Sequence, residues 1–378
     1  MRPVHHIYLI PGFFGFANLG KLTYFGHVRA ALLQGAAARG VSARVHVVKT
    51  HPTASLVKRA ARVAETVAAT AKGGGGPIHL VGHSSGGMDA RLFATPDIKL
   101  PTRVHVDRLA QRLATVVTLS TPHFGTPLAS FFASRFGQQI LLGLSLSTIY
   151  LLRHGQLPLR GLLQLGGLFA RWDSVALNSV LLDHIFDAVL GDFSVGRRRA
   201  VASLFSEVAK DQALLTQLTP EAVDVFNSTV SDRPGVRYGC VVSRSAKPSL
   251  RSVGATGLDP AGQALHTVYT ALYGIAAQTP ARAVPRLSAR QGRALKRAYR
   301  TLPRADANDG IVPTRSQVWG EVIGAARADH LDVIGHFDDA SAHPPHVDWL
   351  ATGTGFTRDR YAKLWGSVLD FLFADSRR

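Results

Sequence analysis

The distribution of apolar residues divides the chain into alternating strand-like and helix-like segments. Short apolar runs, which predict strands, are followed by longer segments in which apolar residues recur every three or four positions, as on one face of a helix. Such alternation predicts a parallel sheet covered by helices, the α/β class. The strands expected in the first part of the chain are residues 6–10, 44–48, 78–82 and 115–119, and the helices are residues 25–38, 55–71 and 86–94.

The alternation stops in the middle of the chain and then returns. Residues 131–217 contain Leu-rich amphipathic stretches without a clear strand. We expect one α/β domain over residues 1–378, with residues 131–217 as a helical lid or cap over the carboxyl edge of the sheet, where open α/β folds bind ligands. The alternative is a helical region with a packing role only. The later elements are expected at residues 236–242 and 318–323, as strands, and 360–373, as a helix.

A glycine-flanked serine follows the strand expected at residues 78–82. The segment reads Gly82-His83-Ser84-Ser85-Gly86 and leads into a helical pattern, which is the form of a nucleophile elbow. In an elbow a sharp strand-to-helix turn exposes the serine hydroxyl, and the glycines let strand and helix pass closely. We therefore expect Ser84 to be a catalytic nucleophile. A structural Gly-Ser turn is the alternative.

A serine nucleophile needs a histidine to accept its proton and an acid to fix the tautomer of that histidine. In this architecture the acid and then the histidine follow the serine along the chain. Asp309 lies in an Asn-Asp-Gly turn, and His330 follows it in Asp-His-Leu-Asp. We expect Asp309 to be the acid and His330 the base. The alternatives are Asp306 for the acid and His336, His343 and His346 for the base.

Two backbone amides are expected to stabilise the oxyanion of the tetrahedral intermediate. One is the amide of Ser85, directly after the nucleophile. The other is expected at Phe13, in the loop after the first strand, where Gly12 lets the backbone turn toward Ser84. The phenylalanines of this loop also predict an apolar wall suited to an acyl chain, although such residues are common in ordinary cores.

The charge of the chain narrows the choice of partners. Lysine and arginine number 43 against 25 aspartate and glutamate residues, a formal charge of +18, which would attract nucleic acid or an anionic membrane surface. The sequence contains no basic helix with interleaved aromatic residues, no zinc-ligand spacing and no RNA-binding signature, so we expect no nucleic-acid partner. The expected partners are a lipid or ester substrate and an anionic membrane or lipid–water interface.

Three features bear on the location of the protein. Cys240 is the single cysteine, so no disulfide can form within the chain and a reducing compartment is compatible. The N-terminus runs into the first expected strand without a signal-peptide pattern. The most hydrophobic run, residues 140–152, is shorter than the roughly 20 residues of a membrane span. These features favour a cytoplasmic or peripheral membrane location, with secretion as the alternative.

Several motifs occur in a fixed order over most of the chain. They are Leu-Ile-Pro-Gly-Phe at residues 9–13, the elbow, Ser-Thr-Pro-His-Phe-Gly-Thr-Pro at 120–127, the Leu-rich insertion, Asn-Asp-Gly at 308–310 and His-Leu-Asp at 330–332. Together they resemble the bacterial triacylglycerol lipases of the α/β-hydrolase superfamily. The resemblance implies an α/β-hydrolase fold and ester hydrolysis. The chain departs from it at Pro11, because these lipases more often have histidine before the glycine of this loop.

The same resemblance implies a structural calcium ion beside the catalytic histidine. Lipases of this family hold the ion with two aspartates and two backbone carbonyls, and Asp259 and Asp332 lie in the matching segments. The resemblance implies the carbonyls of His336 and Ala340 as the remaining ligands, and calcium readily takes such hard oxygen ligands. In the alternative, Asp259 begins a Leu-Asp-Pro turn and Asp332 caps a loop.

The sequence thus predicts a serine hydrolase, a lipase or esterase, that cleaves carboxylic esters with hydrophobic acyl chains through an acyl-enzyme. Acyl transfer to an alcohol on the same scaffold is the alternative activity. A noncatalytic, membrane-associated hydrolase-like protein is the alternative from another class. The positive charge and the apolar insertion favour that alternative, whereas the three triad residue types in the expected order argue against it.

Overall fold

The computed structural model describes residues 3–13, 24–71, 75–134, 137, 141, 211–249, 260–342, 345–348 and 352–374. Most of the lid expected at residues 131–217 therefore lies outside the described residues, as do Asp259 and His343.

Six parallel strands form one sheet in the order β2-β1-β3-β4-β5-β6. Each connection between parallel neighbours therefore crosses a face of the sheet. This arrangement, flanked by helices, is the α/β-hydrolase fold that the sequence predicts. The strands are β1 (His5–Ile10), β2 (Ala43–Val47), β3 (Ile78–His83), β4 (Leu113–Leu119), β5 (Arg237–Arg244) and β6 (Glu321–Arg327).

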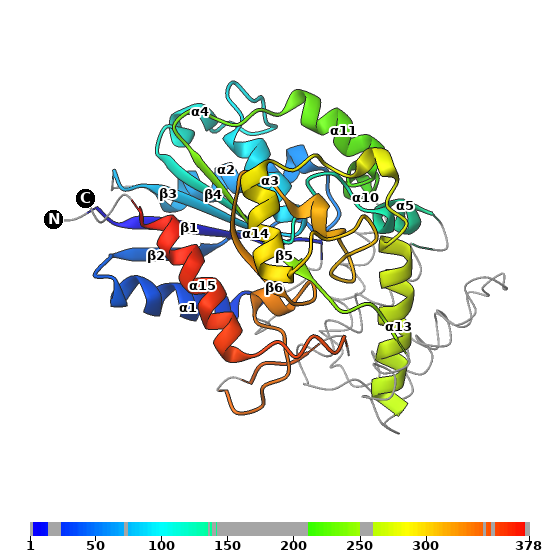
Figure 1. Ribbon diagram of the computed structural model, residues 1–378. Coiled ribbons are helices and arrows are strands. Elements are labelled where there is room, and N and C mark those ends of the chain that lie inside the picture. Colours follow the sequence, from blue (N-terminus) through cyan, green and yellow to red (C-terminus); the bar gives the residue numbers. More distant parts are fainter. Residues whose placement is uncertain are drawn as a thin grey trace, which may run out of the picture.

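Helices cover both faces of the sheet (Figure 1). The α-helices are α1 (Gly26–Ala38), α2 (Leu56–Thr70), α3 (Ser85–Ala94), α4 (Val106–Ala110), α5 (Pro127–Ala133), α10 (Ala213–Gln217), α11 (Pro220–Thr229), α13 (Pro260–Ala276), α14 (Ala289–Tyr299) and α15 (Arg358–Leu372). The short 3₁₀ helices are η1 (Ala281–Ala283), η2 (Thr314–Gln317) and η3 (Asp332–Ile334). Helices α1 and α15 pack on one face, and α2, α3 and α4 pack on the other.

The alternation of side chains along β1 divides the core into two layers. Ile7 and Leu9 belong to the layer under α1 and α15, whereas Tyr8 and Ile10 belong to the layer under α2 and α3. Successive side chains of a strand point to opposite faces, and every residue of β1 is buried. A strand buried on both faces is apolar almost throughout, which explains why a short apolar run was the signal for it.

The observed boundaries differ from the expected ones mainly at β6. The sequence predicts a strand over residues 318–323, but the chain forms η2 before that segment and turns at Gly320, whose φ is 66°. The strand therefore begins at Glu321 and ends at Arg327. None of the helices that the structure describes is long and apolar enough to span a membrane.

Candidate active site

Ser84 occupies the sharp turn between β3 and α3. Its φ of 55° and ψ of −131° are unfavourable for a residue with a side chain, and such strain occurs at active sites where the surroundings enforce it. The flanking glycines explain how the turn is enforced. A Cβ at Gly82 would lie 2.3 Å from the carbonyl oxygen of Gly86, and one at Gly86 would lie 2.2 Å from the carbonyl oxygen of Ile10. Strand β1, strand β3 and helix α3 can approach so closely only with glycine at both positions.

The loop after β1 lies directly against Ser84. A Cβ at Gly12 would come within 2.4 Å of the Ser84 Cβ atom and 3.0 Å of its Oγ atom. Phe13 follows and is buried. Ser85 is the first residue of α3, so its amide is one of the N–H groups that have no acceptor within the helix. Both predicted oxyanion donors thus belong to backbone that adjoins Ser84.

A buried ion pair holds this loop to the helix that follows the nucleophile. Arg59 in α2 donates a hydrogen bond of 2.7 Å to the carbonyl of Pro11 and forms an ion pair of 2.7 Å with Asp89 in α3. Both side chains are fully buried, and burial raises the pKa of Asp89 to about 6, against the opposing effect of Arg59. No motif in the sequence predicted this pair. The available signal was an arginine on the buried face of α2.

Asp309 and His330 form a hydrogen-bonded pair in the interior. Nδ1 of His330 lies 2.9 Å from Oδ2 of Asp309, and both side chains are fully buried. Because the carboxylate accepts the Nδ1 proton, Nε2 of the neutral imidazole is the nitrogen without a proton. This Nε2 atom is buried and has no hydrogen-bond partner among the described residues. It has the geometry expected of a general base that is ready to accept a proton.

Further donors fix the carboxylate of Asp309. Its Oδ1 atom accepts hydrogen bonds from the backbone amides of Ile311 and Val312, at 3.0 and 2.7 Å. Its Oδ2 atom also accepts from the Ser243 hydroxyl at 2.7 Å and from Nε2 of Gln317 at 3.1 Å. These contacts hold the carboxylate in one orientation toward His330. Ser243 and Gln317 were not predicted as site residues, because neither lies in a motif of its own.

The motif at residues 120–127 supports the same region. The hydroxyl of Ser120 lies 2.6 Å from that of Ser243, the residue that donates to Asp309. The hydroxyl of Thr126 donates to the carbonyl of Ile311 at 2.6 Å, in the loop that follows the carboxylate. The motif therefore connects the end of β4 to the loop that carries Asp309.

His330 lies beside the elbow. Nε2 of His83, the residue before Ser84, is 2.8 Å from the backbone carbonyl oxygen of His330, and the two imidazole centroids are 4.8 Å apart. The structure thus brings Ser84, His330 and Asp309 into one region. A hydrogen bond between the Ser84 hydroxyl and Nε2 of His330 is not formed, and such bonds are often long before substrate binds.

The other candidate acids and bases have different partners. Asp306 is half-buried and faces the exposed Arg304 at 3.4 Å. Nε2 of His336 hydrogen-bonds to the carbonyl of Tyr24 at 3.1 Å, and Nδ1 of His346 to the carbonyl of Gly335 at 2.6 Å. His343 lies outside the described residues.

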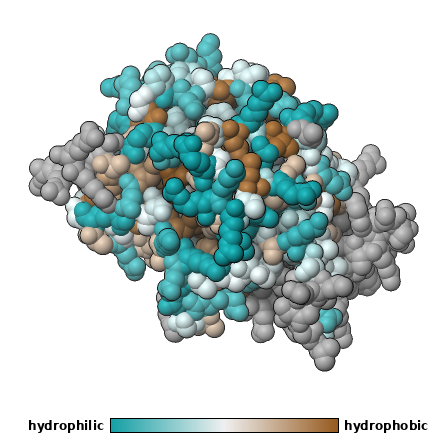
Figure 2. All heavy atoms as spheres, in the orientation of Figure 1, coloured by the Kyte–Doolittle hydropathy of each residue, from teal (hydrophilic) through white to brown (hydrophobic). Residues whose placement is uncertain are grey.

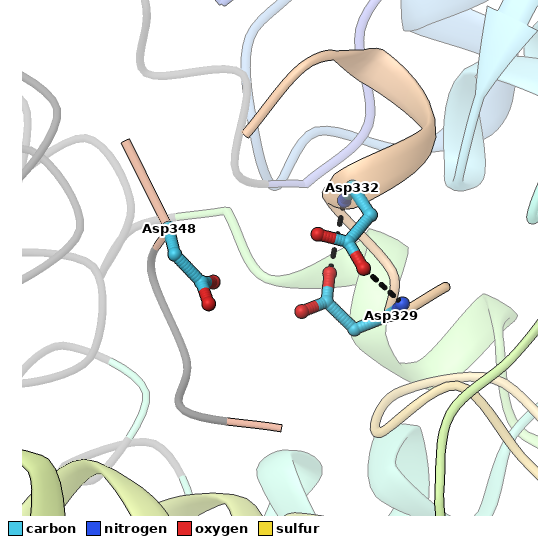
Figure 3. A group of neighbouring side chains, drawn as sticks. All are labelled: Asp329, Asp332 and Asp348. Atoms are coloured by element: carbon cyan, nitrogen blue, oxygen red, sulfur yellow. Dashed lines mark hydrogen bonds between the residues drawn. The ribbon is translucent and has the colours of Figure 1, made fainter. Parts of the chain in front are cut away.

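Asp332 belongs to a group of three carboxylates (Figure 3). Its partners are Asp329, which precedes His330, and Asp348, which approaches from a separate segment; ligand atoms of all three lie within 4.8 Å of one another. Asp329 and Asp332 also accept hydrogen bonds from each other's backbone amides, at 2.9 and 2.8 Å. Asp332 therefore caps the loop, as the alternative interpretation of this residue expects. Asp329 and Asp348 were not predicted to be neighbours of Asp332.

The donor chemistry of this group fits a hard cation. Burial raises the pKa of Asp329 to about 6 and that of Asp332 well above its usual value, and the neighbouring carboxylates add to the rise at Asp332. A calcium ion prefers such carboxylate oxygens. His336 and Ala340 follow Asp332 in the same segment, whereas Asp259 lies outside the part of the chain that the structure describes.

The fold is similar to those of several bacterial esterases and lipases. The crystal structure of the metagenomic carboxyl esterase MGS0156 aligns with a TM-score of 0.50 and 17% identity, over 99% of this chain and 77% of that protein. EstA from Clostridium botulinum aligns with a TM-score of 0.51 and 17% identity, over 97% and 87%. Staphylococcus hyicus lipase aligns with a TM-score of 0.50 and 14% identity, over 99% and 96%.

These similarities identify the α/β-hydrolase fold. No protein-family model matches the sequence, and a comparison with curated protein sequences finds no significant match.

Proposed function

We propose that the protein is a serine hydrolase that cleaves carboxylic esters with hydrophobic acyl chains. The observation that carries this proposal is the buried Asp309–His330 pair beside a strained Ser84. An acid, a base and a serine on a strained elbow are the groups that acyl transfer through an acyl-enzyme requires. Two of the structural neighbours are a carboxyl esterase and a lipase, which supports esters as the substrate class.

Each residue has a defined role in the proposed reaction. The Ser84 Oγ atom attacks the ester carbonyl carbon while Nε2 of His330 accepts its proton. The Asp309 carboxylate accepts the hydrogen bond from Nδ1 of His330, which keeps its proton, and stabilises the imidazolium. The amides of Phe13 and Ser85 donate to the oxyanion of the tetrahedral intermediate. His330 then gives the proton to the leaving alkoxide, and the alcohol departs. A water molecule, deprotonated by His330, next attacks the acyl-enzyme. The carboxylic acid is released as His330 returns the proton to the Ser84 oxygen.

A structural calcium ion is part of the proposal. Asp332 is the ligand supported by its position in the group of three carboxylates. Asp259 and the backbone carbonyls of His336 and Ala340 remain the other candidate ligands. When bound, the ion would neutralise buried carboxylates and fix the loop that carries His330. It would have a structural role and take no part in proton transfer.

We also assign an anionic lipid–water interface as the surface on which the enzyme works. Helix α14 supports this assignment, because its polar side carries the exposed residues Arg293, Lys296 and Arg297. Hydrophilic side chains extend across the middle of the face on which α14 lies (Figure 2). Clustered cationic residues attract anionic head groups. The arginines of the expected lid lie outside the described residues.

A ladder of p-nitrophenyl esters with increasing acyl length tests the activity. The wild-type protein should hydrolyse them with a preference for longer chains, and Ser84→Ala should reduce turnover by several orders of magnitude. Turnover by Ser84→Ala equal to that of the wild type would exclude a mechanism with Ser84 as the nucleophile. The same assay with an added alcohol separates hydrolysis from acyl transfer, because a transferase would form the new ester in preference to the free acid. Absence of turnover on every ester would favour the noncatalytic alternative.

A further inference from the structure

A buried chain of hydrogen bonds connects Tyr24, His83 and His330. The hydroxyl of Tyr24 lies 2.6 Å from Nδ1 of His83, and Nε2 of His83 lies 2.8 Å from the backbone carbonyl oxygen of His330. Tyr24 and His83 are 3% and 0% exposed, so water does not compete for these bonds. None of the catalytic roles proposed above uses Tyr24 or the side chain of His83.

Chemistry fixes the direction of every bond in this chain. A backbone carbonyl oxygen can only accept, so Nε2 of His83 carries a proton and donates it to His330. Burial lowers the pKa of His83 well below its usual value, so the ring is neutral and its Nδ1 atom has no proton. Nδ1 must therefore accept, and the Tyr24 hydroxyl must donate to it. Tyr24 thus holds His83 in the tautomer that can bind His330.

The consequence for the site is a fixed distance between two loops. His83 is the residue before Ser84, so its position is tied to the elbow. The backbone amide of His330 also donates to the carbonyl of Asp309 at 3.1 Å, in addition to the side-chain bond between the same residues. One hydrogen bond therefore joins the backbone of His330 to Asp309, and another joins it to His83, beside the nucleophile.

We propose that Tyr24 and His83 are positioning residues that set the separation between the Ser84 hydroxyl and the imidazole of His330. This role rests on the hydrolysis proposed above, in which the proton passes between these two groups. A displacement of about 1 Å between reacting groups can lower a rate about a hundredfold. Hydrogen bonds that served stability alone would, when removed, lower the stability of the fold without lowering kcat.

Three variants test the role through kcat and KM on a p-nitrophenyl ester. Tyr24→Phe removes the donor to His83, together with the contact of this hydroxyl with the backbone of Gly12, and should lower kcat about tenfold with KM unchanged. His83→Leu removes the whole connection and should lower kcat about a hundredfold. His83→Gln keeps an amide that can donate to the His330 carbonyl, so it should recover part of that loss. The control is Tyr8→Phe, because the buried Tyr8 hydroxyl is bonded to Thr70, at 2.9 Å, in a contact that the proposed mechanism does not use.

The tautomer of His83 provides a second readout. Nitrogen NMR of protein with labelled histidine should show a proton on Nε2 and none on Nδ1 in the wild type, and a mixture of tautomers in Tyr24→Phe. A wild-type His83 with its proton on Nδ1 would overturn the role, as would a kcat in Tyr24→Phe and His83→Leu equal to that of Tyr8→Phe. If the wild-type protein neither hydrolyses esters nor reacts with a phosphonate probe, the proposed function fails first and the positioning role fails with it.

Discussion

Replacing Gly12 by alanine should disable the site while leaving the fold intact. The new Cβ atom would lie 2.4 Å from the Ser84 Cβ atom and 3.0 Å from its Oγ atom, whereas ordinary contacts between such atoms are about 3.5–4 Å. The loop must therefore move away from Ser84 by roughly 1 Å. The amide of Phe13 would move with it.

The size of the effect follows from losing one oxyanion donor. Such a loss costs about 3 kcal/mol in the transition state, a hundredfold to thousandfold decrease in kcat. The added methyl group in a close-packed region should also destabilise the fold by about 1–3 kcal/mol. KM should change little, because the donor acts mainly on the oxyanion formed in the transition state.

Ester hydrolysis and thermal unfolding of the variant measure the two effects separately. Gly292→Ala is the matched control, because Gly292 lies in α14 and, apart from the helix's own backbone and the adjacent residues, no described atom lies within 4 Å of the added Cβ. The control should keep full activity and gain about 1 kcal/mol of stability, because glycine is the weaker helix former. Wild-type kcat in a folded Gly12→Ala variant would refute the placement of the oxyanion donor at Phe13.

Three further predictions concern the acid, the carboxylate group and the response to pH. Asp309→Asn should lower kcat by about four orders of magnitude in ester hydrolysis, while Asp306→Asn should not; the opposite result would exchange their roles. A calcium chelator should lower the melting temperature of the wild type but not of Asp332→Asn. An unchanged wild-type melting curve, together with no bound metal by elemental analysis, would reject the proposed calcium site. Burial lowers the pKa of His79 from 6.5 to about 3, so the folded protein keeps this ring neutral while the unfolded chain binds a proton. Stability should therefore fall as pH decreases from 6.5 toward 3, by up to about 1.4 kcal/mol per pH unit from this group. Denaturant unfolding at two pH values should show a smaller loss of stability for His79→Leu than for the wild type. Equal losses would contradict the burial of a neutral His79.

The sequence predicts the fold well where burial is two-sided, and it misses the mostly solvated helix α14. Strand β3 is buried at every position, so a short, mostly apolar run before a glycine was sufficient to predict it. In α14 only Leu295 and Tyr299 are buried, which leaves too narrow an apolar face for the hydrophobic pattern to detect. The start of β6 depends on the turn at Gly320, which tertiary packing determines.

The candidate site divides in the same way. Ser84, Asp309 and His330 lie in local motifs that specify a turn and a residue type, so the sequence could nominate them. Ser243 and Tyr24 have no such motif. Their hydroxyls contact the site only because the fold brings distant segments together, and a single sequence contains no record of those contacts.

The central claim is that Ser84 is the nucleophile of the site. The most direct measurement is reaction with a fluorophosphonate followed by mass spectrometry of the intact chain and of its peptides. We predict one adduct per chain, located on Ser84, with no adduct in Ser84→Ala and a much slower reaction in His330→Ala. An adduct on another serine, or undiminished labelling of Ser84→Ala, would contradict the account.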